Sequence, residues 1–202
     1  MFYEPAKRDH GLPHDPFKAL VVPRPIGWIT AVSHRGEVNL SPYSFFNAVS
    51  DRPPMVIFSS DGHKDAAAFA EETGEFVCNL ATFDLREAMN ATSAPLPRGQ
   101  SEAEHAGLEL ASSRLVRAPR LAATPAALEC RYVQTVPLLG ADGRGSYLLV
   151  IGEVIGVHID DRFVVDGIVD TAAMRPIARA GYRDYFVATP ETKFSITRPP
   201  GG

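Results

Sequence analysis

The sequence predicts a mainly β protein, built as a closed and largely antiparallel β-barrel with a few peripheral helices. Three observations predict this fold class. Many short runs of β-branched and aromatic residues follow one another with turn residues between them, and few segments have helical spacing. A chain of 202 residues with 45% hydrophobic and 22% charged residues is long enough for one sizeable core and short for two. We therefore expect one globular domain whose barrel leaves few sheet edges exposed.

The first 22 residues are rich in proline, histidine and charge, and we expect them to form a leader packed on the domain, with at most one short helix. His10 and His14 have a spacing seen in metal sites, but Gly11 and Pro13 disfavour the helix that would align them. We therefore interpret the two histidines as a solvent-exposed pair. The domain is expected to span residues 23–190 and a C-terminal tail residues 191–202.

The stretch from residue 24 to residue 47 indicates a strand, a tight turn, a second strand and a polar-aromatic loop. Strand-favouring or small residues open it, and Gly36 can take the positive φ that a turn needs. The loop, residues 41–47, combines hydroxyls, an amide and three aromatic rings. This combination suits a flat aromatic ligand with a polar tail. A buried turn whose Ser and Asn side chains bind local backbone groups is an equally good interpretation.

A short buried strand at residues 55–60 comes next, followed by an alanine-rich amphipathic helix from Lys64 to Glu72 that ends at Gly74. Lys64 in the first turn opposes the helix dipole. A phosphate at this helix start would accept hydrogen bonds from Lys64 and from the free backbone N–H groups. A solvated lysine beside Asp65 is the alternative.

The second half of the chain continues the alternation of strands and short helices. We expect a strand at 75–81, a helix opened by Asp84 with capping-box spacing to Glu87, and a long loop at 93–107 with at most one short helix. Strands at 128–136 and 147–159 flank a glycine cluster at 140–145, which we interpret as a hairpin loop because its spacing is not G-x-G-x-x-G and no helix follows it. A tight turn at 160–161 leads into residues 163–165, and 171–175 are expected to form one helical turn.

Several classes of function are disfavoured. The net charge of −4, without a basic stripe, argues against a nucleic-acid partner, and no apolar run has the length of a membrane span. Cys78 and Cys130 are expected to be buried free thiols in a reducing, cytoplasmic compartment. No nucleophilic triad or metal-ligand cluster is evident. Redox chemistry supplied by a bound cofactor remains open.

Motifs spread over nearly the whole chain resemble those of the flavin reductase-like family, the FMN-binding split barrels, and follow the family's order. The resemblance implies an antiparallel, Greek-key split β-barrel, and a homodimer that holds FMN at its interface. The residues that carry it are Arg24 to Thr30, Asn39 to Asn47, Asp51 to Pro54, Lys64-Asp65, Thr73 to Leu80, Leu128 to Cys130, Ile151 to Val154 and Arg179 to Tyr185.

The resemblance also implies the cofactor contacts. Ala66 stands where the family usually has Thr, which removes one possible hydrogen bond near the phosphate. The implied contacts are Trp28, Ile29, Thr30 and Ala31 along the isoalloxazine ring; Ser44, Phe45, Phe46 and Asn47 at the ring edge and ribityl chain; Ser59, Ser60, Lys64 and Asp65 around the phosphate; and Arg179, Tyr182 and Tyr185 from the tail.

The implied activity is that of an NAD(P)H-dependent flavin reductase. It would pass hydride from NADH or NADPH to bound FMN, and reducing equivalents onward to a flavin, a partner oxygenase or a small acceptor. Two alternatives stay open at this point. One is a flavoredoxin-like FMN electron carrier that is reduced by a partner protein, and the other is a flavin-free structural member of the fold.

Overall fold

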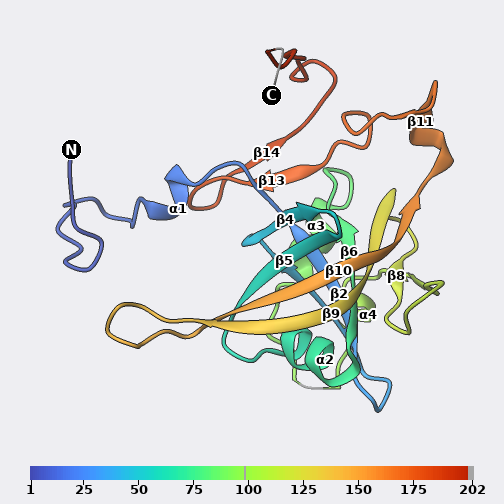
Figure 1. The fold of residues 1–202 in the computed structure, drawn as a ribbon, viewed down its shortest axis with the longest axis horizontal. Helices are drawn as coiled ribbons and strands as arrows, with labels where there is room; N and C mark the ends of the chain where they lie inside the picture. The colour runs from blue at the N-terminus through green and yellow to red at the C-terminus, as the bar shows by residue number, and fades with distance from the viewer. Residues whose placement is uncertain (98, 200–202) are drawn as a thin grey trace.

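The computed structural model describes residues 1–97 and 99–199. A curved, antiparallel seven-stranded sheet dominates it, in the order β3-β2-β6-β9-β10-β5-β4 (Figure 1). The mainly β class is confirmed. The strands of this sheet are β2 (Gly27–Val32), β3 (Val38–Tyr43), β4 (Phe46–Asp51), β5 (Pro54–Asp61), β6 (Glu75–Leu80), β9 (Ala126–Leu138) and β10 (Tyr147–Ile159).

The two ends of this sheet, β3 and β4, are consecutive in the chain. Within the described residues they pair with β2 and β5 respectively and not with each other, so the barrel is open at a seam between β3 and β4. The strand pattern alone predicts full closure, whereas the resemblance implies the split barrel that the structure has. Ser44 and Phe45 connect the two strands at this seam. The N–H of Ser59 donates to the carbonyl oxygen of Phe45 at 2.8 Å, which turns the chain onto β5.

The predicted polar-aromatic loop at 41–47 is therefore mostly strand. Its first part belongs to β3 and its last part to β4, and the Phe46 ring packs over Gly27. A Cβ built on Gly27 would lie 2.4 Å from that ring, so only glycine allows this close approach. Its polar and aromatic side chains lie at the seam, because β3 ends at Tyr43 and β4 begins at Phe46.

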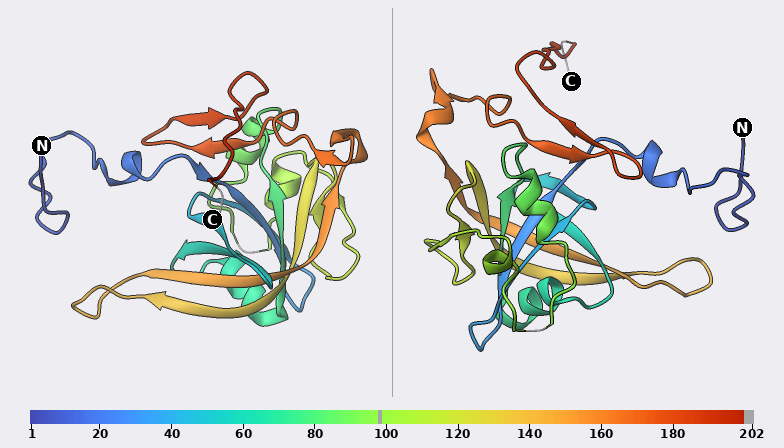
Figure 2. Two further views of the ribbon diagram at one scale, coloured as in Figure 1. Left: turned by 45° about the horizontal axis from the view of Figure 1, so that its top comes forward. Right: turned by 180° about the vertical axis from the view of Figure 1, so that it is seen from behind.

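Three buried clusters fill the barrel and its surroundings in the described chain, the smallest of them around Val32 and Val77. The largest one packs the inner side chains of the sheet, such as Phe58 and Phe76, against helix α2 (Asp65–Thr73), which ends at Gly74 with φ 76° as expected. Both thiols, Cys78 and Cys130, are free and lie in this cluster, as predicted. The second cluster surrounds Trp28 beneath α3 (Arg86–Ala91) and α4 (Glu102–His105). Figure 2 shows the helices lying on the outside of the barrel.

Short elements at both ends of the chain meet above the seam. β1 (Arg24–Pro25) pairs with β13 (Ile177–Arg179), which pairs with β14 (Tyr185–Val187), so the tail strands lie beside the start of the domain (Figure 1). The leader contains one short helix, as expected, and its first residues project away from the barrel (Figure 1). The remaining elements are α1 (Phe17–Leu20), β7 (Leu110–Ala111), β8 (Arg120–Leu121), η1 (Asp161–Phe163), β11 (Val164–Val165) and β12 (Ile168–Val169).

Two local expectations are corrected. The helix near Asp84 forms, but its N-cap is Leu85 without a side-chain cap, because the carboxylate of Asp84 instead accepts a 2.9 Å hydrogen bond from Arg175. The segment 171–175 forms hydrogen-bonded turns and not a helix. The long strands β9 and β10 and the hairpin between them are as predicted. The end of the expected tail, residues 200–202, and residue 98 of the long loop lie outside the described residues.

Candidate functional site

A cavity of about 750 Å³ lies where the leader, the seam and the tail meet. A second, smaller cavity of about 150 Å³ adjoins it, since Ser44 and Arg179 line both. The smaller cavity also reaches Tyr185 and the start of the loop after α3. The two cavities thus open onto the seam. The side chains lining the larger one come from Pro13, His14, Asp15, Lys18, Arg24, Ser44, Arg179, Tyr182, Arg183 and Asp184.

Arg24 forms a buried part of the larger cavity's lining. It is 7% exposed, and its guanidinium donates to the carbonyl oxygens of Lys18, of Val21 at 2.5 Å and of Ala180 at 2.9 Å. Its Nε is buried and has no hydrogen-bond partner among the described residues. Burial and the nearby positive charge of Arg179 lower the pKa of Arg24. An anion in this place would relieve that repulsion.

Arg179 is held by the tail turn that follows β13. Its guanidinium donates to the hydroxyl of Tyr185 and to the backbone carbonyl oxygen of Tyr182, and it lies 4.5 Å from the centre of the Tyr185 ring. Gly181 in this turn touches the leader: an added Cβ would lie 2.5 Å from the Cβ of Ala19. Glycine is thus required for the leader helix and the tail turn to approach and enclose the cavity.

Phe45 links the arginines to β5. Its ring lies 5.8 Å from the guanidinium carbon of Arg24 and 5.8 Å, centre to centre, from the ring of Tyr147. The backbone of Phe45 accepts the N–H of Ser59. The hydroxyl of Ser59 is buried and has no hydrogen-bond partner among the described residues. A buried hydroxyl without a partner costs roughly 1–3 kcal/mol of stability, so this one is available to a ligand group.

Lys64 and Asp65 stand at the start of α2. Lys64 is its N-cap and not a first-turn residue; it is exposed, makes no side-chain cap, and has no carboxylate within ion-pair distance in the described parts of the chain. Asp65 lines a different cavity, of about 510 Å³, together with the buried Glu102. Burial raises the pKa of Tyr43 to about 12. A hydrogen bond with Ser60 opposes this rise, and the nearby Asp65 and Glu102 add to it. Lys64 is therefore the residue of this group that offers an unpaired charge.

The family model described as "Flavin reductase like domain" matches residues 19–167. The chain belongs to the flavin reductase-like family. Two relatives are similar to this chain over most of their length. One, an uncharacterized protein of Deinococcus radiodurans, is 40% identical over 187 residues, which is 86% of this chain and 79% of the relative. Another, of Halalkalibacterium halodurans, is 37% identical over 184 residues, 89% of this chain and 87% of the relative.

Solved structures agree with the family. Nitrilotriacetate monooxygenase component B from Bacillus cereus superposes with a TM-score of 0.88 and 27% identity, covering 97% of this chain and 98% of that one. A 2-nitrobenzoate 2-nitroreductase from Pseudomonas fluorescens superposes with a TM-score of 0.79 and 26% sequence identity, and 92% of each chain is covered. A Shewanella frigidimarina structure, described as having a split barrel domain, superposes with a TM-score of 0.79 over 99% of this chain and 94% of that one. At 23% sequence identity this likeness is evidence for the fold and not for function. The flavin reductase-like chain is therefore a split β-barrel, with its split at the β3–β4 seam.

Four of the predicted site residues in this flavin reductase-like chain are fully buried in the single chain. Trp28, Ile29, Thr30 and Ala31 are each 0% exposed, and the indole N–H of Trp28 donates to the hydroxyl of Thr92 at 2.9 Å. β2 lies between β3 and β6 in the sheet, and all of its residues are buried. In the single chain these four residues are covered by their neighbours, and their contact with a flavin ring stays a prediction.

The other predicted residues divide between two places. Around the seam and its cavities the structure brings together Ser44, Phe45, Ser59, Arg179, Tyr182 and Tyr185, with Phe46 and the exposed Asn47 continuing into β4. Lys64, Asp65 and Ser60 lie at the turn into α2, where the Ser60 hydroxyl donates to the carbonyl oxygen of Gly62 at 2.8 Å. Ser60 is fully buried and already paired, so it offers a ligand nothing further.

Sequence reasoning missed four basic residues of the larger cavity, His14, Lys18, Arg24 and Arg183. Arg24 was in a recognised motif but received no role, and its pairing with Arg179 in the sheet joins positions 155 residues apart. A lone arginine before a proline gives no local sign of that pairing.

Two further observations concern metal sites and membrane spans in the described residues. Among residues 1–97 and 99–199, no group of three or more His, Cys, Asp or Glu side chains is placed to hold a metal ion. No helix in the same residues is long and apolar enough to cross a membrane.

Proposed function

We propose that the protein is an FMN-dependent reductase. It takes hydride from NADH or NADPH and passes reducing equivalents to free flavin, a partner oxygenase or a small acceptor. The observation that carries this proposal is a pair of buried polar groups without a hydrogen-bond partner in the described chain, the Ser59 hydroxyl and the Nε of Arg24, beside the positive charge of Arg179. Groups of this kind are stabilised by a polar, negatively charged ligand. Family membership supports a flavin as that ligand.

The residues present fit FMN. Its phosphate would lie at the start of α2, where Lys64 and the free N–H groups of the first helical turn favour an anion. The hydroxyl of Ser59 lies on the strand that leads to this turn and would accept or donate a hydrogen bond to the polar chain of the cofactor. Ser44, Phe45 and Asn47 at the seam would hold the edge of the ring system.

FMN, when bound, would supply the redox chemistry, since it accepts a hydride and releases electrons singly or in pairs. The tasks of the chain are binding, orientation and electrostatics. Arg24 and Arg179 provide fixed positive charge at Ser44, which favours negative charge on any group that lies there. The exposed rings of Tyr182 and Tyr185 line the opening and offer faces for a second aromatic substrate.

We also propose that the protein is a homodimer with the flavin groove at its interface. Strand β4 supports this, because it is an edge strand that is exposed along almost its whole length, with Val49 53% exposed. Exposed, unpaired edge strands are usually covered by another chain or element. A sedimentation measurement that gave a monomer at micromolar concentration with FMN bound would contradict this arrangement.

The Bacillus cereus neighbour is described as a monooxygenase component, and an oxygenase is therefore our proposed partner class.

The test is anaerobic mixing of FMN-loaded protein with NADH and, separately, with NADPH, while the visible flavin absorbance is followed. Free FMN at the same concentration is the control. Rapid loss of the band with either donor, faster than in the control, is the expected result. A stable yellow spectrum would contradict the reductase proposal and favour the electron carrier. A protein that fails to quench added FMN fluorescence would contradict flavin binding itself.

A further inference from the structure

The larger cavity carries an excess of positive charge. Four permanently charged basic side chains face two carboxylates there, although the whole chain has a net charge of −4. Among the described residues none of these four has a carboxylate within ion-pair distance. The carboxylate of Asp15 is engaged as an acceptor, at 2.9 Å from the N–H of Phe17. The basic side chains are Lys18, Arg24, Arg179 and Arg183.

Part of this charge is built into the fold. Arg24 is more than nine-tenths buried, is fixed by three backbone carbonyl oxygens, and keeps its Nε without a partner in the described chain. Arg179 is fixed by Tyr182 and Tyr185. Solvated surface lysines and arginines need no explanation, but two restrained guanidinium groups of like charge beside one cavity are stabilised by a shared anion. Lys18 and Arg183 extend the same charge to the exposed rim.

The cavity also has an aromatic wall. Tyr182 is 49% exposed as a residue, and its ring lies 5.7 Å, centre to centre, from the ring of His14, tilted by 52°. Tyr182 sits at φ 55° in the tail turn, and its carbonyl oxygen is tied to Arg179, so the position of its backbone is restrained. A volume of about 750 Å³ lies in the range of pockets that hold nucleotide-sized ligands. The combination of anion-binding groups and an exposed ring matches a nucleotide.

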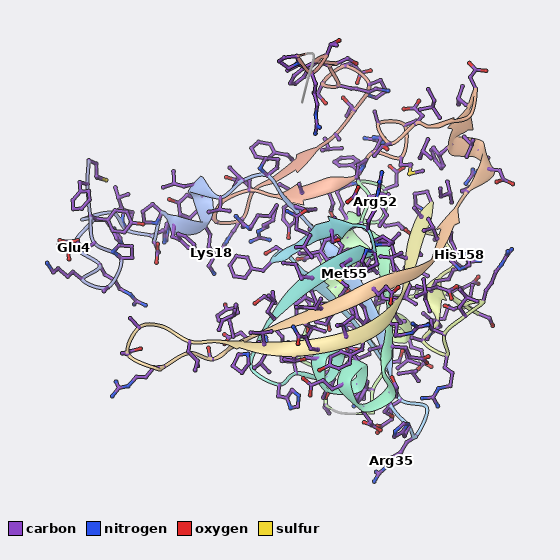
Figure 3. The ribbon with its side chains drawn as sticks, in the orientation of Figure 1. Glu4, Lys18, Arg35, Arg52, Met55 and His158 are labelled. Carbon is purple, nitrogen blue, oxygen red and sulfur yellow. The ribbon has the colours of Figure 1, made fainter. Side chains whose placement is uncertain are left out.

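We propose that this cavity binds the adenosine phosphate portion of the nicotinamide donor, with phosphate oxygens against Lys18, Arg179 and Arg183 and the adenine against Tyr182. The inference rests on the proposed function, because it takes the donor to be a nicotinamide nucleotide. It assigns the leader and the tail to the donor, whereas Lys64 on α2 serves the flavin phosphate. Figure 3 shows Lys18 on the leader helix, to the side of the barrel. The phosphate is either the 2′-phosphate that only NADPH carries or the pyrophosphate that both donors share.

Isothermal titration calorimetry with the full chain tests this site directly, without turnover. The probes are 2′-AMP, 5′-AMP, adenosine and inorganic phosphate. We expect at least one AMP isomer to bind about tenfold or more tightly than adenosine or phosphate, since one charge-assisted contact contributes about that much. Tighter binding of 2′-AMP would identify the 2′-phosphate of NADPH, and tighter binding of 5′-AMP the pyrophosphate.

Variants separate this site from general charge effects. Lys18→Gln and Arg183→Gln should each weaken AMP binding about tenfold. Lys7→Gln, which removes a leader charge that is paired with Glu4 and outside the cavity, should leave AMP affinity unchanged. FMN affinity, measured by fluorescence quenching, should be the same in all three variants.

Three results would overturn the proposal. They are unchanged AMP affinity in Lys18→Gln and Arg183→Gln, equal affinity for phosphate and AMP, and a loss of FMN affinity without a loss of riboflavin affinity in these variants. The last result would assign the cavity to the flavin phosphate. Failure of both NADH and NADPH to reduce the flavin in a protein that binds AMP through Lys18 and Arg183 would instead contradict the proposed function and leave the nucleotide site standing.

Discussion

Glu129 on β9 is the charged residue most completely buried in the described chain, and its replacement by glutamine should be strongly destabilising. Its carboxylate oxygens accept the backbone N–H groups of Arg114 at 2.7 Å, Leu115 at 2.6 Å and Val116 at 3.2 Å, and they pair with the imidazole of His158. Figure 3 places His158 across the molecule from Lys18. The cluster therefore lies away from the site and fastens the loop at 112–117 to the barrel.

The magnitude follows from the count of hydrogen bonds. Each oxygen of Glu129 accepts two of the four, and glutamine replaces one oxygen with an NH₂ group that cannot accept them. Hydrogen bonds to a charged group contribute about 1.5 kcal/mol or more each, so the loss is about 3 kcal/mol. Glu153→Gln is the matched control, because Glu153 lies on the next strand, is a third exposed and sits 3.6 Å from Arg131. It should cost less than about 1 kcal/mol.

Urea unfolding at neutral and acid pH is the assay. Burial alone would raise the pKa of Glu129, but the N–H groups of Arg114 and Leu115 and the imidazole of His158 outweigh it and lower that pKa. A lowered folded-state pKa stabilises the fold above the ordinary value of about 4.3, and this stabilisation is lost as the pH falls through the folded-state pKa. The difference between wild type and Glu129→Gln should therefore shrink in acid. A difference below about 1 kcal/mol at neutral pH, or one that grows in acid, would refute the reasoning.

Three further predictions concern the site and the core. Lys64→Ala should weaken FMN binding at least about tenfold and riboflavin binding hardly at all, because only FMN carries the phosphate that Lys64 would contact. Equal losses of affinity for the two ligands in fluorescence titrations would contradict the role assigned to Lys64. Ser59→Ala should leave the unfolding free energy unchanged or raise it by up to about 1 kcal/mol, because it deletes a buried hydroxyl without a partner in the described chain. The same change should weaken FMN binding. A marked loss of stability would show that the hydroxyl is satisfied in the folded protein. Burial and the neighbouring Cys130 thiol raise the pKa of the Cys78 thiol, and both thiols are buried. Both should therefore react with a disulfide reagent only as fast as the protein unfolds. Rapid labelling of native protein would contradict their burial.

Much of the fold could be predicted because its signals are local. The helix ending at Gly74, the hairpin between β9 and β10 and the burial of Cys78 and Cys130 each follow from spacing or turn residues within a few positions. The open seam could not be predicted in this way, since it depends on Ser59 pairing with Phe45 and not on any feature of β3 or β4 alone.

The candidate site was predicted in part, for the same reason. The motif that contains Trp28 was recognised, but Trp28 is buried in a cluster of residues from distant parts of the chain, and its indole N–H donates to Thr92, 64 positions later. The cavity itself depends on Ala19 packing against Gly181 and on Arg24 facing Arg179. Contacts between the two ends of a chain leave no periodic pattern in either end, so only the structure shows that His14, Lys18 and Arg183 line one cavity.

The central claim is that a flavin lies at the β3–β4 seam. A crystal structure of the protein with FMN tests it most directly. We predict density for the ring system beside Ser44 and Asn47, for the phosphate at Lys64, and a hydrogen bond to the Ser59 hydroxyl. FMN bound in the acidic cavity beside Asp65 and Glu102, or at the AMP-binding cavity with the seam empty, would contradict the account.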